Sequence, residues 1–220
     1  MEFDVPYLLR HLPALGRGLA LTIQVSALAI VLSVVVGLVG ASLRVMRFPV
    51  LSQAAAAYVE FIRNTPLLVQ LFFVFFGLPT VGLTLSLFWS GVFALTLWAG
   101  AFQIENVRGG LASVSPGLNE AARALGLSKG QYLRFVGLPL AVRVGLPSIL
   151  NTSVSLIKNS AYLSAIGLQE LTGVAFDRIA IDFRAFEMLS VLLAGYLSVV
   201  LTLSAAVRAF EYRLQAPFRR

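Results

Sequence analysis

Long apolar runs are the feature that most restricts how this sequence can fold. A helix of about 20 apolar residues crosses the roughly 30 Å hydrocarbon core of a bilayer. Of the 220 residues, 58% are hydrophobic and 12% are charged, and the mean hydropathy of +0.87 lies far outside the range of soluble domains. The sequence therefore predicts an all-α integral membrane protein that forms a single transmembrane domain over residues 1–220. Its five transmembrane helices are expected at residues 19–43, 54–78, 85–103, 143–167 and 188–210.

Two segments near the beginning of the chain need a more detailed interpretation. Residues 1–18 mix acidic and basic side chains, which predicts a short amphipathic segment at the membrane interface. Within the second apolar run, Thr65-Pro66 is typical of a helix start, but a helix from Pro66 to Gly77 would cover only about 18 Å. Because that length does not cross a bilayer, we expect one span that is kinked at Pro66.

The residue types needed for enzymatic or metal chemistry are scarce. The sequence has no Cys and a single His, His11, so disulfides and thiolate sites are excluded and an imidazole metal site is not expected. It shows no nucleophile with an adjacent base, no phosphate-binding glycine loop and no pair of carboxylates within a span. We therefore expect no catalytic residue and no metal ligand in this chain.

Basic residues are distributed unevenly between the two ends of the predicted spans. Lys and Arg accumulate on the cytoplasmic side of membrane proteins. This bias predicts an N-terminus outside, a C-terminus in the cytoplasm and a cytoplasmic loop over residues 106–140. The net charge of +7 then reflects membrane topology, and no nucleic-acid partner is expected. The basic residues on the predicted inner side are Arg44, Arg47, Arg63, Arg108, Arg123, Lys129, Arg134, Arg143, Arg208, Arg213, Arg219 and Arg220, against Arg10, Arg17, Arg178 and Arg184 outside.

The cytoplasmic loop contains the longest stretch that does not resemble a membrane span. Ser115 can cap a helix that begins at Pro116, because proline lacks only a donor that has no partner in the first turn. Helix-forming residues follow, and Gly126 is a typical left-handed stop. We therefore expect a first short helix from Pro116 to Gly126.

A second short helix is expected directly after this glycine. Ser128 with Gln131 forms a capping-box pattern, and Pro139 predicts that the helix ends near Gly137. Taken alone, a helix, a turn and another helix fit a docking unit in the aqueous phase, a solvated linker or a DNA-binding helix-turn-helix.

Glu120-Ala121-Ala122, followed by Gly126 and then Leu138-Pro139, resembles the EAA loop of ABC-importer permeases. In that family the loop contains a coupling helix that sits in a cleft of the ATPase subunit. The resemblance therefore implies a type I ABC importer-like fold with a cytoplasmic coupling-helix loop. A DNA-binding helix-turn-helix is not expected in a loop held this tightly between two spans. The residues that it implies in ATPase coupling are Glu120, Ala121, Ala122, Leu125 and Gly126.

Resemblance to the polar-amino-acid subgroup of these permeases extends over nearly the whole chain. The stretch from Arg63 to Leu68 resembles its Arg-x-Thr-Pro-Leu-Leu segment, and Leu156 to Ser160 resembles its Leu-Lys-Asp-Thr-Ser segment. This chain departs from the pattern at Gln103-Ile104, where a small residue is usual, and at Asn159, where Asp is frequent. The substrate pathway expected from the resemblance includes Thr65, Gln103, Lys158, Asn159, Ser160 and Tyr162.

The same resemblance implies how the transporter is assembled. It predicts a permease subunit of the bacterial inner membrane that translocates polar amino acids by alternating access. Its partners would be a second permease subunit, identical or different, an extracytoplasmic solute-binding protein and a separate ABC ATPase that binds ATP with Mg. The alternatives are an importer of another small solute, a self-contained secondary transporter or channel, and a structural membrane subunit. Secondary transporters usually place acidic or His residues within spans, whereas Lys158 is the ionisable residue deep in a predicted span here.

Lys158 also bears on the charge of the substrate. It lies about 22 Å along a helix from Arg143, which places it in the outer half of the membrane. Its ammonium group either snorkels to the outer headgroups or lines a cavity together with Asn159 and Ser160. Because no acidic residue lies within that span, a cationic solute would meet an unbalanced positive charge. The sequence therefore predicts a neutral or acidic polar amino acid.

The predicted topology can be tested with single cysteines, because the parent sequence has none. A cysteine at Lys129 should react with an impermeant thiol reagent only from the cytoplasmic side, and one at Asp182 only from outside. Labelling of intact cells and of inverted vesicles measures both. The opposite sidedness would contradict the orientation and the cytoplasmic location of the loop.

Overall fold

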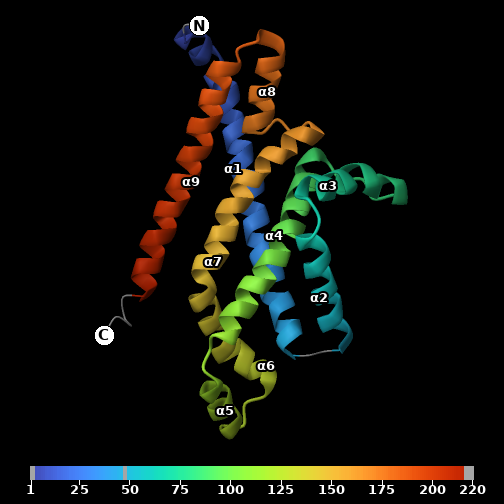
Figure 1. The fold of residues 1–220 in the computed structure, drawn as a ribbon, viewed down its shortest axis with the longest axis vertical. Helices are drawn as coiled ribbons and strands as arrows, with labels where there is room; N and C mark the ends of the chain where they lie inside the picture. Colours follow the sequence, from blue (N-terminus) through green and yellow to red (C-terminus); the bar gives the residue numbers. More distant parts are fainter. Residues whose placement is uncertain (1–2, 47–48, 216–220) are drawn as a thin grey trace. The chain divides into compact units, whose positions relative to one another are not determined.

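In the computed structural model every regular element of the described residues, 3–46 and 49–215, is helical (Figure 1). Lipid offers no hydrogen-bonding partners, so the backbone N–H and C=O groups of a membrane segment must bond to each other within that segment, as they do in a helix. The elements are α1 (Val5–Met46), α2 (Pro49–Arg63), α3 (Leu67–Phe72), η1 (Phe73–Gly77), η2 (Leu78–Val81), α4 (Leu87–Ala112), α5 (Pro116–Ala124), α6 (Lys129–Tyr132), η3 (Leu133–Gly137), α7 (Leu138–Asn159), η4 (Ser160–Ile166), α8 (Leu171–Asp182) and α9 (Ala185–Gln215).

The long helices confirm the predicted all-α membrane architecture. Within the described residues, four helical segments are long and apolar enough to cross a bilayer, and the number is five if α2 and the helical segment from Leu67 to Val81 together count as one span. The predicted third and fifth spans are extended in the structure, to the 26 residues of α4 and the 31 residues of α9. The helix α8, between the last two long segments, has 12 residues and was not predicted.

The N-terminal segment does not form a separate interfacial piece as predicted. Its described part from Val5 onward is the beginning of α1, a continuous helix of 42 residues that contains Pro13. Leu15 is buried to 2% exposure in a core with Leu171 and Met188, so this part of α1 packs against α8 and α9. That packing gives the segment tertiary contacts that an amphipathic pattern alone does not reveal.

The second apolar run is interrupted at Pro66 and not merely kinked there. The helix α2 ends at Arg63, and α3 begins at Leu67 after a turn and a bend. Asn64 Nδ2 and Thr65 Oγ1 donate to backbone carbonyls of the last turn of α2, at 2.8 and 3.0 Å. Pro66 contributes no N–H and disfavours the helical conformation of the residue before it. The helix therefore stops.

The two short helices of the loop follow the predicted local signals. Gly126 adopts a left-handed φ of +77° after α5. Ser115 occupies the N-cap position of α5 as predicted, but its side chain makes no capping hydrogen bond. At the start of α6, Ser128 and Gln131 form the capping box, with bonds of 2.8 Å and 3.3 Å. Both are local features, which explains why sequence rules find them.

The predicted end of the second short helix near Gly137 is wrong. The chain continues from α6 through a π-helical turn, η3, directly into α7. In an α-helix the ring of Pro139 would clash with the carbonyl four residues earlier. The wider π turn, closed by a bond from the Leu138 N–H to the Leu133 carbonyl, lies over those residues and avoids the clash.

The described residues divide into two compact units. Unit 1 consists of those within 1–29, 67–95 and 154–207, and unit 2 of those within 30–66, 96–153 and 208–220. The core of unit 1 contains Leu15, Leu171, Ala175 and Met188. Unit 2 has two cores, one around Val59, Ile62, Ala101 and Ile104, and one around Ala41, Val107 and Ile149.

In unit 2, α4 and α7 approach so closely at Gly110 that no side chain fits. A Cβ atom added to Gly110 would lie 2.2 Å from the carbonyl oxygen of Ala141, whereas one added to the neighbouring Gly109 would meet nothing within 4 Å. Small residues of this kind allow membrane helices to pack backbone to backbone.

We therefore expect Gly110→Ala to destabilise the purified protein by about 1–3 kcal/mol, the usual cost of overpacking. The matched variant Gly109→Ala should leave stability unchanged. Thermal unfolding of both variants in one detergent measures the difference, and equal melting temperatures would contradict the close packing of α4 on α7.

Candidate functional site

The loop between α4 and α7 is largely exposed, and it carries α5 at one end of these two helices (Figure 1). Glu120 and Ala121 are exposed, and Leu125, just after the helix, is 80% exposed although its side chain is apolar. Ala122 differs from them, because only 4% of it is exposed and it packs inside this chain. Of the residues implied in coupling, three therefore face outward on or beside α5, while Ala122 holds the helix against its own unit.

Gly126 fixes the turn between α5 and α6. Its left-handed φ of +77° disfavours any residue with a Cβ, but the space around it is open. A side chain here would strain the backbone without meeting a neighbour. The position is thus constrained by conformation alone.

The expected substrate-pathway residues do not lie together in one unit. Thr65 and Gln103 belong to unit 2, and the other four belong to unit 1. Gln103 is fully buried, where its Nε2 donates to the Ile149 carbonyl at 3.1 Å and its Oε1 accepts from Asn106 at 3.0 Å. Within unit 2 it therefore holds α4 against α7.

The four pathway residues in unit 1 are placed around the junction of α7 and η4. Lys158 and Tyr162 are exposed, Asn159 is partly buried, and Ser160 is fully buried with its hydroxyl donating to the Ile157 carbonyl at 2.7 Å. Lys158 and Asn159 are thus available to a solute, whereas the Ser160 hydroxyl is already engaged.

A buried carboxyl group in unit 1 was not anticipated from the sequence. Glu170 is fully buried, and its Oε1 accepts from the Gly173 N–H at 2.9 Å as the N-cap of α8. Its Oε2 accepts from the Tyr196 hydroxyl at 2.8 Å and lies 3.1 Å from Thr22 Oγ1. One carboxyl group therefore joins α1, α8 and α9. No local sequence pattern indicates this burial, because Thr22 lies 148 residues away.

The surroundings of Glu170 favour its protonated form. Burial raises the pKa of its carboxyl group above the ordinary value of 4.5, while hydrogen bonds from Thr172, Tyr196, Gly173 and Thr22 oppose that shift. Thr22 has one hydroxyl proton and two acceptors at 3.1 Å, the Gly18 carbonyl and Glu170. A proton on Glu170 would satisfy both groups.

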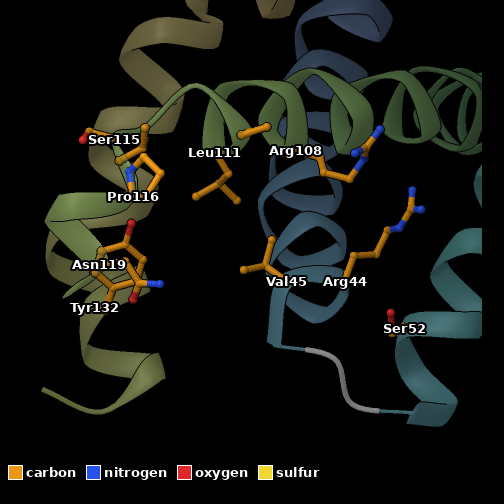
Figure 2. Close-up of a pocket in the computed structure, with 11 residues that line it drawn as sticks. Arg44, Val45, Ser52, Arg108, Leu111, Ser115, Pro116, Asn119 and Tyr132 are labelled. Atoms are coloured by element: carbon orange, nitrogen blue, oxygen red, sulfur yellow. The ribbon is translucent and has the colours of Figure 1, made fainter. Parts of the chain in front are cut away.

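In unit 2, arginine side chains balance the charge of another acidic residue. Glu105 on α4 accepts two bonds from Arg108 at its Oε2, of 3.0 Å from Nε and 2.5 Å from Nη2, and Arg44 of α1 pairs with its Oε1. A pocket of about 610 Å³ adjoins these arginines and reaches to Ser115 and Pro116 at the start of α5 (Figure 2). Among the described residues, no group of three or more His, Cys, Asp or Glu could hold a metal ion.

Comparison with known proteins gives consistent matches. The family model described as "binding-protein-dependent transport system inner membrane component" matches residues 13–216. The probable glutamine ABC transporter permease protein GlnP of Bacillus subtilis (strain 168) is 38% identical over 97% of this chain and 99% of its own length. The glutamine transport system permease protein GlnP of Escherichia coli (strain K12) is 34% identical over 98% of this chain and 99% of its own.

A solved structure agrees with these matches. The crystal structure of an amino acid ABC transporter with histidines contains a chain that aligns with a TM-score of 0.87 at 34% identity. The alignment covers 97% of this chain and 100% of that one.

The buried carboxyl group leads to a prediction about pH. Because the folded protein holds the Glu170 proton more tightly than the unfolded chain does, this contribution to stability is complete below the unfolded pKa and is lost as pH rises through the folded pKa. The melting temperature of the wild type should therefore fall relative to that of Glu170→Gln as the pH rises above about 4.5. Melting curves across pH in detergent measure this, and a constant difference between the two proteins would contradict it.

Proposed function

We propose that this chain, which belongs to the family of binding-protein-dependent transport system inner membrane components, imports a polar amino acid. It is a permease subunit of an ABC importer, and the ATPase of such transporters is a separate partner. Its helices cross the membrane and its role is transport, not catalysis. Membership of the family implies ATP-driven transport and partner subunits.

The observation that carries the coupling proposal is the exposed α5 with its glycine turn between two long apolar segments. Glu120, Ala121 and Leu125 are accessible to a partner, and an apolar side chain that is 80% exposed suits a protein contact better than water. We assign these three residues to the ATPase contact. Gly126 sets the direction in which α5 leaves α6, and Ala122 packs α5 onto its own unit.

The helical continuity after α5 supplies a route by which movement reaches the membrane. From Lys129 the chain is helical through η3 into α7, and α7 packs backbone to backbone on α4 at Gly110. A displacement of α5 by a closing ATPase pair would therefore move the inner ends of α4 and α7 together. Such a rigid-body change is the kind of step that alternating access requires.

The remaining parts of the proposal concern partners, orientation and solute. We propose a second permease subunit, an extracytoplasmic solute-binding protein and an ATPase that binds ATP with Mg. We also propose that the N-terminus lies outside and the C-terminus in the cytoplasm, because basic residues are more numerous on the predicted inner side of the spans. Amino-acid import is supported by the named roles of the glutamine permeases that this chain resembles.

For the solute, we propose contacts with Lys158 and Asn159. The Lys158 side chain is exposed at the end of α7, and Asn159 offers both a donor and an acceptor. Among the described residues Lys158 forms no ion pair. The acid nearest to it in sequence, Glu170, is buried and accepts hydrogen bonds from Gly173 and Tyr196. A neutral or acidic polar amino acid therefore suits this site better than a cationic one.

Replacing Gly126 by Val tests the coupling proposal. A β-branched residue in the left-handed region costs roughly 1–3 kcal/mol, which should redirect the turn. We expect the assembled transporter to keep its membrane insertion and to lose transport-coupled ATP hydrolysis in proteoliposomes.

The matched control for this variant is Gly130→Val. Gly130 lies in the same loop, and a Cβ there also meets nothing within 4 Å, but its φ is not positive. The control should couple ATP hydrolysis to transport normally. Normal coupling in Gly126→Val would show that the turn does not transmit movement.

Competition between amino acids tests the proposed solute. Unlabelled glutamine or glutamate should compete for uptake through the reconstituted transporter more strongly than arginine or lysine. The Lys158→Gln variant should narrow this preference, because it removes the charge that repels cations. Stronger competition by arginine and lysine in the wild type would refute the charge argument while leaving the coupling proposal intact.

A further inference from the structure

Three guanidinium groups surround Glu105 in unit 2. Arg108 makes the bidentate contact described above, and Arg44, in the last turn of α1, pairs with the other carboxylate oxygen. Arg63, the last residue of α2, lies with its guanidinium 5.4 Å from the centre of the Phe102 ring and acts electrostatically on Glu105. The ends of three helices thus bring their positive charges to one carboxylate.

This group carries excess positive charge. Three arginines and one glutamate give +3 − 1 = +2. Among the described residues, Glu105 is the only carboxylate that forms an ion pair with Arg44 or Arg108. The acid one turn before Arg63, Glu60, accepts instead from Asn64 at 2.9 Å. Unbalanced charge at a partly buried position is costly unless an anion is available nearby.

The charges also lie at a definite depth. Arg44 follows the long apolar run of α1, and Arg108 lies in the last part of the apolar helix α4. The end of an apolar span marks the boundary between hydrocarbon and headgroups, where lipid phosphates are found. The guanidinium groups therefore stand at the level of phosphates, in whichever leaflet contacts the α5 end of the spans.

The pocket beside these arginines has the room for a headgroup. Its volume of about 610 Å³ falls within the range of ligand sites in proteins. Figure 2 shows Arg44 and Arg108 extending to one end of the pocket, with Val45 and Leu111 between them and Ser115. Ser52 of α2 also lines the pocket and offers a hydroxyl donor.

The surroundings of the pocket favour a lipid over a side chain from another protein. Next to Ser52, Val50 is 77% exposed and Leu51 is 51% exposed, and Val45 in the lining is 39% exposed. Apolar side chains exposed at the end of a span are suited to hydrocarbon and not to water. A ligand with an anionic head and apolar tails satisfies the arginines and these side chains at once.

We propose that Arg44 and Arg108 bind the phosphate group of an anionic phospholipid at this pocket. Guanidinium groups match phosphate oxygens in a bidentate geometry. A phosphate would also balance the positive charge of the arginines that Glu105 does not neutralise. Because the pocket extends to Ser115 and Pro116, the bound headgroup lies beside the beginning of α5. The lipid thus occupies a site of its own, separate from the exposed residues of α5.

The test measures lipid association with the purified transporter in bilayers. Spin-labelled phosphatidylglycerol and spin-labelled phosphatidylcholine are compared by electron paramagnetic resonance, and the wild type should prefer phosphatidylglycerol. Arg44→Gln and Arg108→Gln should each lower this preference by up to about fivefold, the effect of one basic residue at a charged membrane surface. Arg208→Gln removes one exposed arginine of α9 that does not line the pocket, so it should leave the preference nearly unchanged.

Several outcomes decide the proposal. Equal association of the two lipids with the wild type, or equal losses in Arg208→Gln and the pocket variants, would overturn it. Loss of ATPase co-purification in Arg44→Gln with an unchanged lipid preference would also overturn it, in favour of a protein contact. Arg108 is 45% exposed, so Arg108→Gln keeps the test valid if Arg44→Gln does not fold.

A second arm distinguishes the source of the phosphate. Inorganic phosphate is added to the wild type and compared with sodium chloride at equal ionic strength. Displacement of phosphatidylglycerol by phosphate beyond the effect of chloride would support the phosphate site and make soluble phosphate a second source. Equal effects of the two salts would support the lipid headgroup as its source, provided that the pocket variants lose the preference.

Discussion

The bilayer's lack of hydrogen-bonding partners is the constraint on which the rest of this structure depends. Every backbone group within the hydrocarbon must be satisfied inside its own segment, so the chain is helical wherever it crosses. Deviations from regular helix then become informative. The ladder is interrupted at Asn64–Pro66, is wider in the π turn at Leu133–Gly137 and is tighter in the 3-10 segment at Ser160–Ile166. The 3-10 segment begins directly after Lys158 and Asn159, the residues proposed to contact the solute.

Glu105 and Glu170 show how the same side chain is stabilised in two ways. Glu105 stands at the end of a span and is surrounded by arginines, which favour its charged form and leave positive charge over. Glu170 is surrounded by hydroxyl groups and one N–H, and burial favours its neutral form. The first arrangement suits recognition of an anion at the headgroup level. The second joins α1, α8 and α9 through one carboxyl group.

Transport by such a chain requires a segment that is accessible to a partner subunit and rigidly connected to the membrane-spanning helices. The exposed α5 provides the accessible piece, and Gly126 sets its direction without any steric contact. The helical path through α6 and η3 into α7, together with the backbone contact at Gly110, provides the rigid connection. The pocket of the proposed lipid site reaches Ser115 and Pro116 at the beginning of α5.

The sequence by itself determined the features that depend on neighbouring residues or on local hydropathy. These include the long apolar helices, the N-cap Ser115, the left-handed Gly126 and the capping box of Ser128 and Gln131. Only the tertiary structure decided which side chains are buried. Ala122 faces inward although its neighbour Ala121 is exposed, and Glu170 is buried because Thr22, 148 residues away, packs against it. Arg44 and Glu105, 61 residues apart, meet for the same reason. Local rules describe bonds within a turn or two, whereas these contacts arise from helix packing, which no short window of sequence contains.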